Sequence, residues 1–219
     1  MKLFLRLGNA IVIILFLILV FIALDHFNYL PKKSYTSADF NVDFIESNVD
    51  KDNDGIDDYS DILTGAKEFV SKKPKYKSAY YSGGYPTDDY YVCTDLIWYA
   101  LKNAGYNFKE LIDRDIEENI EDYDIDVQDK NIDFRRVRNI LIFLDKWTES
   151  LTTDASDYEN WQGGDIVVYE NHIAIVSDKR NKKGISYIIH HDGYHKYEED
   201  ALDRKKIIGH YRFNLKLED

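Results

Sequence analysis

The chain has 219 residues, of which 44% are apolar and 15% aromatic, so it is long enough for one medium-sized domain with a hydrophobic core. Its 40 acidic and 28 basic side chains give a formal charge of −12, which argues against the extended basic surface that nucleic-acid binding requires. The single cysteine excludes an intramolecular disulfide and a cysteine-based zinc cluster. This thiol therefore either fills space in the core or acts as a nucleophile.

A long apolar segment lies near the N-terminus. Residues 7–24 contain Asn9 as their one polar side chain, and they follow Lys2 and Arg6. As a helix they would span roughly 27 Å, close to the thickness of a membrane's hydrocarbon core. We expect residues 1–24 to form either a single-pass membrane anchor or a cleaved secretory signal, because both have a basic start and an apolar stretch. Either interpretation predicts that the rest of the chain is exported across a cell membrane, as an anchored domain or as a secreted one.

Residues 25–48 have a mixed composition and are expected to form a loose linker, and an acidic loop follows at residues 49–61. Carboxylates at alternate loop positions turn toward one centre, and Gly55 permits a sharp bend, as a calcium ion requires. The loop resembles the single calcium loops of dockerin-type or thrombospondin-type repeats, although its twelfth position is Asp instead of Glu. The alternative is an acidic helix N-terminus without an ion. The predicted ligands are Asp50, Asp52, Asp54, the backbone carbonyl of Ile56, Asp58 and Asp61.

The remainder of the chain, residues 62–214, has helical patterns first and strand patterns later. An α+β fold with an antiparallel sheet is therefore expected. Residues 110–133 are strongly acidic, which predicts a solvated surface insertion. Apolar residues at helical spacing predict helices at 62–70, 96–104 and 137–144, and short β-branched runs predict at least four strands, at 164–169, 172–177, 185–190 and 207–213.

The lone cysteine, Cys93, is expected at or just before a helix N-terminus. There the helix dipole and unpaired N–H groups stabilise a thiolate and can hold an oxyanion. His172 begins one predicted strand and His190 ends the next, so an antiparallel hairpin would bring the two imidazoles to the same edge as base and orienting group. The alternatives are an inert core cysteine and a zinc site formed by both histidines with His191 and Asp192.

The other histidines are expected to be non-catalytic. His210 lies within a predicted strand and is expected to be structural. His191 and His195 lie in a polar turn, where they are expected to be solvated.

Several ordered motifs resemble those of the NlpC-type cell-wall cysteine peptidases of the papain-like superfamily. More closely, the run over about residues 60–213 resembles an uncharacterised bacterial domain-of-unknown-function family of that superfamily. One departure is His191-Asp192, which stands where Asn followed by an apolar residue is expected. The motifs that carry the resemblance lie at residues 83–86, 91–95, 131–137, 164–167, 172–176, 188–190 and 209–212.

The resemblance implies a papain-like fold, with the cysteine helix packed on an antiparallel sheet that carries both histidines. It implies that Cys93 is the nucleophile, His172 the general base and His190 the group that orients His172. The implied activity is that of an exported, membrane-anchored cysteine hydrolase that cleaves an amide or peptide bond in peptidoglycan stem peptides, with no cofactor for catalysis. A thiol amidase, esterase or acyltransferase on another substrate is the first alternative. A non-catalytic, calcium-stabilised surface module and a metal-dependent hydrolase are the others.

Overall fold

The computed structural model describes residues 2–26, 29–194 and 197–215, and the chain divides into two compact units, Met1–Lys33 and Ser34–Asp219. The first unit contains helix α1 (Lys2–His26). Its stretch Leu7–His26 has a mean hydropathy of 3.1 and is long and apolar enough to cross a membrane. The expected N-terminal apolar helix is therefore present.

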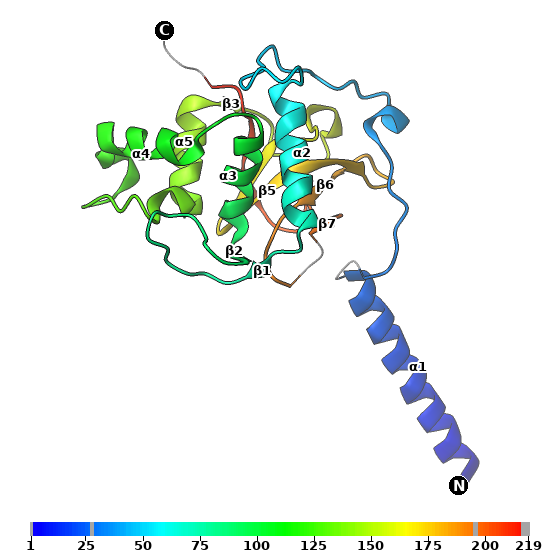
Figure 1. Ribbon diagram of the computed structural model, residues 1–219. Coiled ribbons are helices and arrows are strands. Elements are labelled where there is room, and N and C mark those ends of the chain that lie inside the picture. Colours follow the sequence, from blue (N-terminus) through cyan, green and yellow to red (C-terminus); the bar gives the residue numbers. More distant parts are fainter. Residues whose placement is uncertain (1, 27–28, 195–196, 216–219) are drawn as a thin grey trace. The chain divides into compact units, whose positions relative to one another are not determined.

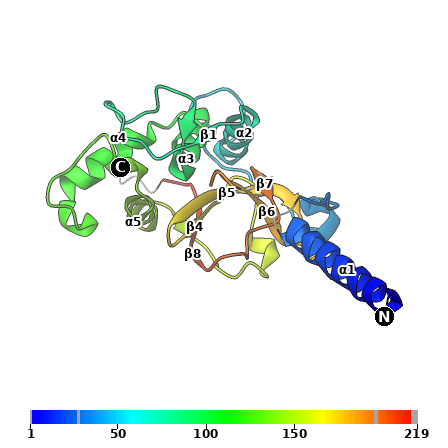
Figure 2. The ribbon, with the colours of Figure 1, turned by 90° about the horizontal axis from the view of Figure 1, so that it is seen from below.

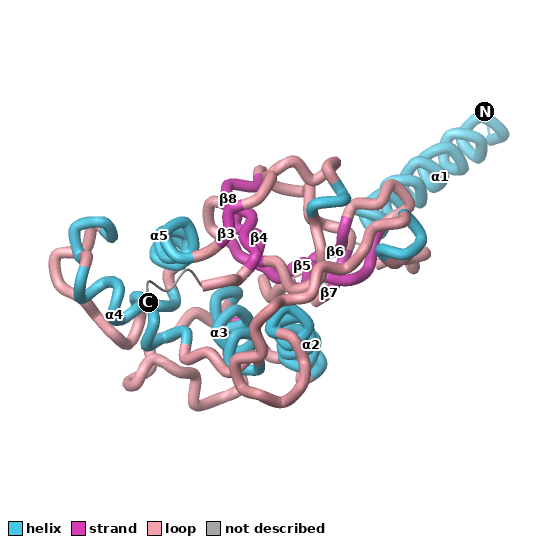
Figure 3. Tube along the Cα trace, turned by 90° about the horizontal axis from the view of Figure 1, so that it is seen from above, coloured by secondary structure: helices cyan, strands magenta, loops and turns pink. Residues whose placement is uncertain are grey.

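The second unit is an α+β domain (Figure 1). It is built on a six-stranded antiparallel sheet with the order β3-β8-β4-β5-β6-β7, and Figure 3 labels all six strands. The four strands expected from β-branched runs are present, and two short strands extend the sheet at its edges. The six are β3 (Glu149–Ser150), β4 (Ile166–Tyr169), β5 (His172–Arg180), β6 (Ser186–Ile189), β7 (Glu198–Glu199) and β8 (Ile207–Arg212).

The helices and the remaining short elements precede the sheet or lie between its strands. They are η1 (Ser37–Phe40), α2 (Asp58–Ser71), β1 (Lys75–Tyr76), β2 (Tyr90–Tyr91), α3 (Cys93–Asn103), α4 (Phe108–Glu118), η2 (Ile120–Tyr123), η3 (Asp133–Arg135), α5 (Val137–Trp147) and η4 (Tyr158–Asn160). The strands β1 and β2 pair with each other in parallel, directly before α3. The helices expected at 62–70, 96–104 and 137–144 correspond to α2, α3 and α5.

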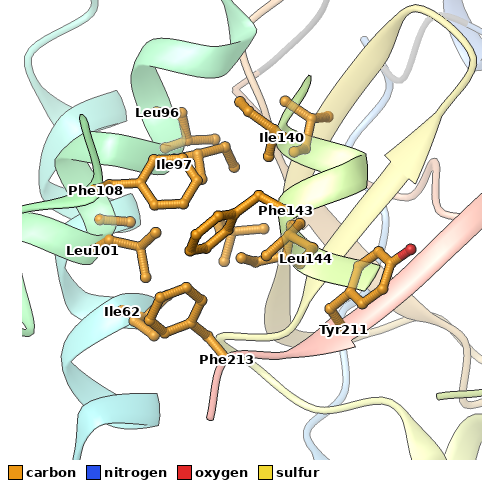
Figure 4. Packing of buried hydrophobic residues seen from close by; sticks show 14 of the residues in the cluster. Ile62, Leu96, Ile97, Leu101, Phe108, Ile140, Phe143, Leu144, Tyr211 and Phe213 are labelled. Atoms are coloured by element: carbon orange, nitrogen blue, oxygen red, sulfur yellow. The ribbon is translucent and has the colours of Figure 1, made fainter. Parts of the chain in front are cut away.

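The sheet separates two hydrophobic clusters, because successive residues of a strand face opposite sides. In β4, Ile166 and Val168 join a large cluster with the helices, whereas Val167 and Tyr169 join a smaller cluster on the other face. Figure 3 shows α2 and α3 side by side next to β5, and Figure 2 shows the same layers from below. The larger cluster fills the space between these helices, α5 and the sheet (Figure 4).

Helices α2 and α3 pack unusually closely. A Cβ atom at Gly65 of α2 would lie 2.6 Å from Cβ of Asn103 and 3.0 Å from Cα of Ala100. Such contacts are too short, so glycine is required where the two helices meet. The close approach fixes α3, and therefore its first residue, Cys93, against its neighbours.

The acidic stretch at 110–133 differs from the predicted solvated insertion. Helix α4 buries Ile112 and Ile116, and η2 buries Tyr123. Asp115 is also buried, where it accepts a hydrogen bond from the Tyr123 hydroxyl and pairs with Lys146 at 2.9 Å. The prediction of a solvated insertion was wrong for two reasons. The abundance of carboxylates obscured the apolar face of a helix, and part of the acidic charge is neutralised by ion pairing inside the fold.

The expected loose linker at 25–48 also differs from the structure over its second half. Tyr35 forms an antiparallel bridge with Arg180, and the two backbones exchange hydrogen bonds of 2.8 and 2.7 Å. The buried Arg180 side chain also donates to the hydroxyl of Ser37 at 3.0 Å. Residues from Ser34 onward therefore belong to the folded unit, because β5 extends past the end of β4 and its backbone groups at Arg180 are free to pair with Tyr35.

Candidate functional site

The cysteine lies where the sequence places it, as the first residue of α3, and its side chain is only 7% exposed. Burial raises the pKa of the Cys93 thiol to about 11, although the nearby N–H groups of Ile173 and Thr94 act in the opposite direction. The expected stabilisation of a thiolate at the helix N-terminus is therefore outweighed by the loss of hydration. In this resting state the thiol is neutral at pH 7.

Asp95 and Arg135 hold the start of α3 in place. The buried Asp95 carboxylate accepts hydrogen bonds from the backbone N–H of Val92 at 2.8 Å and from the indole N–H of Trp98 at 2.9 Å. Arg135 donates to both oxygens of Asp95, from Nε and Nη2, each at 2.8 Å. This two-point ion pair compensates a negative charge that acts to raise the pKa of the Cys93 thiol.

The β5–β6 hairpin brings His172 and His190 together. Ile175 of β5 pairs with Ile189 of β6, so the start of one strand lies beside the end of the other. His172 Nε2 is 2.9 Å from His190 Nδ1. Both imidazoles are buried, with 8% and 3% exposure. The strand order alone is therefore sufficient to juxtapose these two rings.

Two residues that sequence reasoning missed extend this pair. Glu199 Oε1 lies 3.1 Å from His190 Nε2 and 2.6 Å from Nη1 of Arg204. Glu199 is 2% exposed and belongs to the two-residue strand β7, whose backbone pairs with the end of β6. Such a short strand has no periodic pattern, so no sequence signal places Glu199 beside the histidines.

These partners determine which ring nitrogens carry protons. The Glu199 carboxylate, paired with Arg204, only accepts hydrogen bonds, so Nε2 of His190 carries the proton that faces it. Nδ1 of neutral His190 is then an acceptor, and His172 donates to it from Nε2. His172 therefore keeps a lone pair on Nδ1, the nitrogen that can take up a proton.

The His172 imidazole is neutral at pH 7, like the Cys93 thiol. Burial lowers the pKa of His172 to about 3, and the electrostatic effects of the neighbouring His190 and Lys205 act in the same direction. No hydrogen bond joins the Cys93 thiol to His172 in the described part of the chain; the sulfur instead lies near the N–H of Ile173, the next residue of β5. Nucleophile and base often approach closely only when substrate is bound.

The other histidines differ in their surroundings. His191 is 2% exposed and packs against the ring of Tyr76, so the prediction that it is solvated was wrong. Burial lowers its pKa. His195 lies outside the described residues. His210 is structural, as expected, because its ring nitrogens lie 2.7 Å from the Thr152 carbonyl and 3.1 Å from the buried carboxylate of Asp165.

The structure brings part of the predicted calcium loop together. Carboxylate oxygens of Asp50, Asp52 and Asp54 lie within 4.8 Å of one another. Across residues 2–26, 29–194 and 197–215, no other group of three or more histidine, cysteine or acidic side chains converges in this way, so the alternative zinc cluster at the histidines is not formed. Ile56 follows in the same loop with an exposed side chain.

The last two acidic positions of the loop are buried in α2. Asp58 is committed to the fold, because it accepts hydrogen bonds from the N–H of Lys51 at 2.9 Å and from the hydroxyl of Tyr106. Asp61 is 3% exposed, and its Oδ2 is buried without a hydrogen-bond partner. Burial and the nearby carboxylates, Asp54 first, raise the pKa of Asp61 to about 6.

The alternative role of the loop, an acidic helix N-terminus, is also present, because a loop residue outside the predicted calcium ligands caps α2. Asp57 is the N-cap of α2, and its carboxylate accepts hydrogen bonds from the N–H groups of Tyr59 at 3.1 Å and Ser47 at 2.9 Å. The carboxylates of Asp50, Asp52 and Asp54 are therefore not needed as caps.

Comparisons with known proteins show the family of the folded domain. Residues 63–213 match the family model described as "Domain of unknown function (DUF1287)". The chain is 31% identical over 170 residues to the protein described as "Uncharacterized protein YijF" from Escherichia coli (strain K12). The aligned region covers 71% of this chain and 82% of that protein. No solved structure matches the chain. The matched region includes Cys93, both paired histidines and Glu199, and the chain belongs to the DUF1287 family.

Proposed function

We propose that this chain is an exported cysteine hydrolase of the NlpC type, with a papain-like fold, that cleaves an amide or peptide bond in peptidoglycan stem peptides. One observation carries the proposal. The hydrogen-bonded series from Arg204 through Glu199 and His190 to His172 leaves a lone pair on Nδ1 of a buried imidazole. The imidazole belongs to His172, which immediately precedes Ile173 in the chain, and the backbone N–H of Ile173 contacts Cys93, the only thiol of the sequence.

The proposed reaction begins with both reacting groups neutral. His172 Nδ1 takes the thiol proton while the Cys93 sulfur attacks the substrate carbonyl carbon, and the backbone N–H of Cys93 helps to hold the resulting oxyanion. The imidazolium still donates from Nε2 to His190, so the pair stays intact. His172 then gives its proton to the leaving amine, and the acyl group remains on sulfur as a thioester. Water, deprotonated by His172, hydrolyses this thioester and restores the thiol.

Export is the part of the proposal that rests on α1. Residues 7–24 would hold the chain in the bacterial cell membrane with the domain outside, or a signal peptidase would release the domain. Both arrangements deliver the site to the compartment that contains the wall.

The proposal is tested by digestion of purified bacterial wall with the full chain in mild detergent. We expect the wild-type chain to release peptide fragments that mass spectrometry detects, and Cys93→Ala to release none. Thr94→Ser is the matched control, because it keeps the hydroxyl that donates to the Arg135 carbonyl at 3.0 Å beside the nucleophile. Identical fragment patterns from the wild-type and Cys93→Ala chains would remove the wall-hydrolase proposal.

Alkylation separates the main alternatives. Cys93 is the only cysteine, so iodoacetamide labelling reports this thiol alone. A thiol hydrolase acting on another substrate would leave the wall intact, yet its labelling rate would fall in His172→Ala. A non-catalytic module would leave the wall intact and label identically with and without His172.

We propose in addition that the 50–61 loop holds a structural calcium ion. Asp50, Asp52 and Asp54 supply carboxylate oxygens that already converge, and Asp61 supplies a buried oxygen without a hydrogen-bond partner. An ion would explain why this carboxylate is buried beside others of the same charge. Asp58 is the weakest of the predicted ligands, since its buried carboxylate lies outside the converging group and accepts hydrogen bonds from Lys51 and Tyr106.

Calcium binding is tested by thermal unfolding with calcium, with magnesium and with a chelator. Calcium at about 100 times its dissociation constant should stabilise the chain by about 2.7 kcal/mol. Asp61→Asn should abolish most of this gain, whereas Asp43→Asn, outside the loop, should retain it. Equal melting temperatures with calcium and chelator would show that the loop needs no ion.

A further inference from the structure

A cavity of about 620 Å³ reaches His172 from the turn between β4 and β5. One wall is that turn, and the other is the segment that leads into β8. Its polar groups are therefore close to the proposed base without belonging to the hydrogen-bonded series behind it. The lining residues are Tyr169, Glu170, Asn171, His172, Lys205, Lys206 and Ile208.

Two lysines give this cavity a positive charge. Lys205 and Lys206 are both exposed, and neither forms an ion pair with an acidic side chain within the described residues. Elsewhere in this acidic protein several lysines are paired, for example Lys146 with Asp115 at 2.9 Å. Glu170 lines the same cavity, so the lining side chains leave a net charge of one positive unit.

The segment that carries the lysines is anchored on both sides. Before it, the Leu202 carbonyl accepts a hydrogen bond from the Tyr169 hydroxyl at 2.9 Å, and Arg204 pairs with Glu199 at 2.6 Å. After it, Ile207 pairs with Tyr169 in the sheet. The lysines are thus held near the base, and the Lys205 charge is close enough to lower the pKa of His172.

We propose that this cavity binds a carboxylate of the substrate, through Lys205 and Lys206, next to the bond that is cleaved. The inference rests on the proposed function and narrows it to acidic peptides. A chain with a formal charge of −12 repels such peptides on average, so a local positive site beside the base is needed to attract and orient them. Two partly solvated lysine–carboxylate contacts together strengthen binding roughly tenfold.

The test measures binding and cleavage separately. Binding is measured by sedimentation of the full-length Cys93→Ala chain with insoluble purified wall, with and without Lys205→Ser and Lys206→Ser. The matched control carries Lys182→Ser and Lys183→Ser, two exposed lysines in the turn between β5 and β6. Three probes are compared: untreated wall, wall whose carboxylates are converted to amides, and wall treated with hydrofluoric acid to remove phosphate polymers.

We expect the Lys205/Lys206 variant to bind untreated wall roughly tenfold more weakly, and the control variant to bind like the parent. Amidated wall should bind the parent as weakly as untreated wall binds the variant, and acid-treated wall should bind the parent normally. Equal binding by parent and variant, or a loss with acid-treated wall alone, would overturn the carboxylate site. Lysine-dependent binding without any cleavage by the wild-type chain would support the site and remove the proposed function.

Discussion

Glu199→Gln tests which ring nitrogens of His190 and of the candidate base, His172, carry protons. Glutamine has nearly the same shape, but its amide group can donate as well as accept. If it donates to His190 Nε2, the proton on His190 moves to Nδ1, and His172 must accept at Nε2. His172 Nδ1 would then carry the proton and could no longer take one from Cys93.

The expected losses follow from the contacts. A general base contributes about 10²–10⁴-fold to a rate, so a wrong tautomer in most molecules should lower kcat/KM by about 10²-fold. The substitution also removes the charge that faces Arg204 at 2.6 Å. Because the Arg204 side chain is 22% exposed and partly hydrated, the free energy of unfolding should fall by only about 1–2 kcal/mol.

The assay is wall digestion across pH, with urea unfolding measured on the same preparations. The control is Glu198→Gln, one residue earlier, where the carboxylate lies 2.5 Å from the Ser177 hydroxyl and from Lys179 but does not contact a histidine. We expect this control to keep its digestion rate. A folded Glu199→Gln chain that digests wall at the wild-type rate would refute the assignment of protons to Nε2 of both His190 and His172.

Three further results are expected. Arg135→Ala leaves the buried Asp95 carboxylate unpaired and should lower the free energy of unfolding in urea by about 3–5 kcal/mol, whereas Arg138→Ala, in an exposed pair, should change it little. His172 has a folded-state pKa of about 3 against about 6.5 unfolded. Its contribution to the free energy of unfolding is therefore complete above pH 6.5 and should be lost by about 1.4 kcal/mol per pH unit as the pH falls toward 3. Urea titrations at several pH values measure this slope, and His172→Gln should reduce it. The full chain should sediment with membranes after an alkaline carbonate wash, and removal of residues 1–33 should release it; a full chain left in the supernatant would contradict the anchor.

The sheet and the histidine pair could be predicted from the sequence because their determinants are local. The β-branched runs around residues 166–176 determine the strands, and one tight turn makes them antiparallel neighbours. The position of His190 relative to His172 then follows from strand direction. The N-terminal apolar helix was equally predictable, since its composition alone requires it.

The missed features depend on contacts between distant segments. Glu199 reaches His190 because a two-residue strand pairs with β6, a pairing that no local pattern indicates. The sequence predicts that Asp115 lies on the surface, because its partner Lys146 belongs to another helix and their ion pair has no local sequence signal. The expectation that a helix N-terminus stabilises the Cys93 thiolate was also wrong, since burial raises the pKa of this thiol. The sequence indicates where the helix begins, but it does not indicate how deeply its first residue is buried.

The burial of Cys93 also has a consequence for chemical durability. Oxidation of a cysteine to a sulfenic acid, or to a mixed disulfide, proceeds through the thiolate and needs access to the sulfur. A thiol that is 7% exposed, with a pKa raised to about 11, presents little of either. The chain also has no second cysteine with which to form an internal disulfide, so both its composition and the burial of the sulfur favour the reduced thiol.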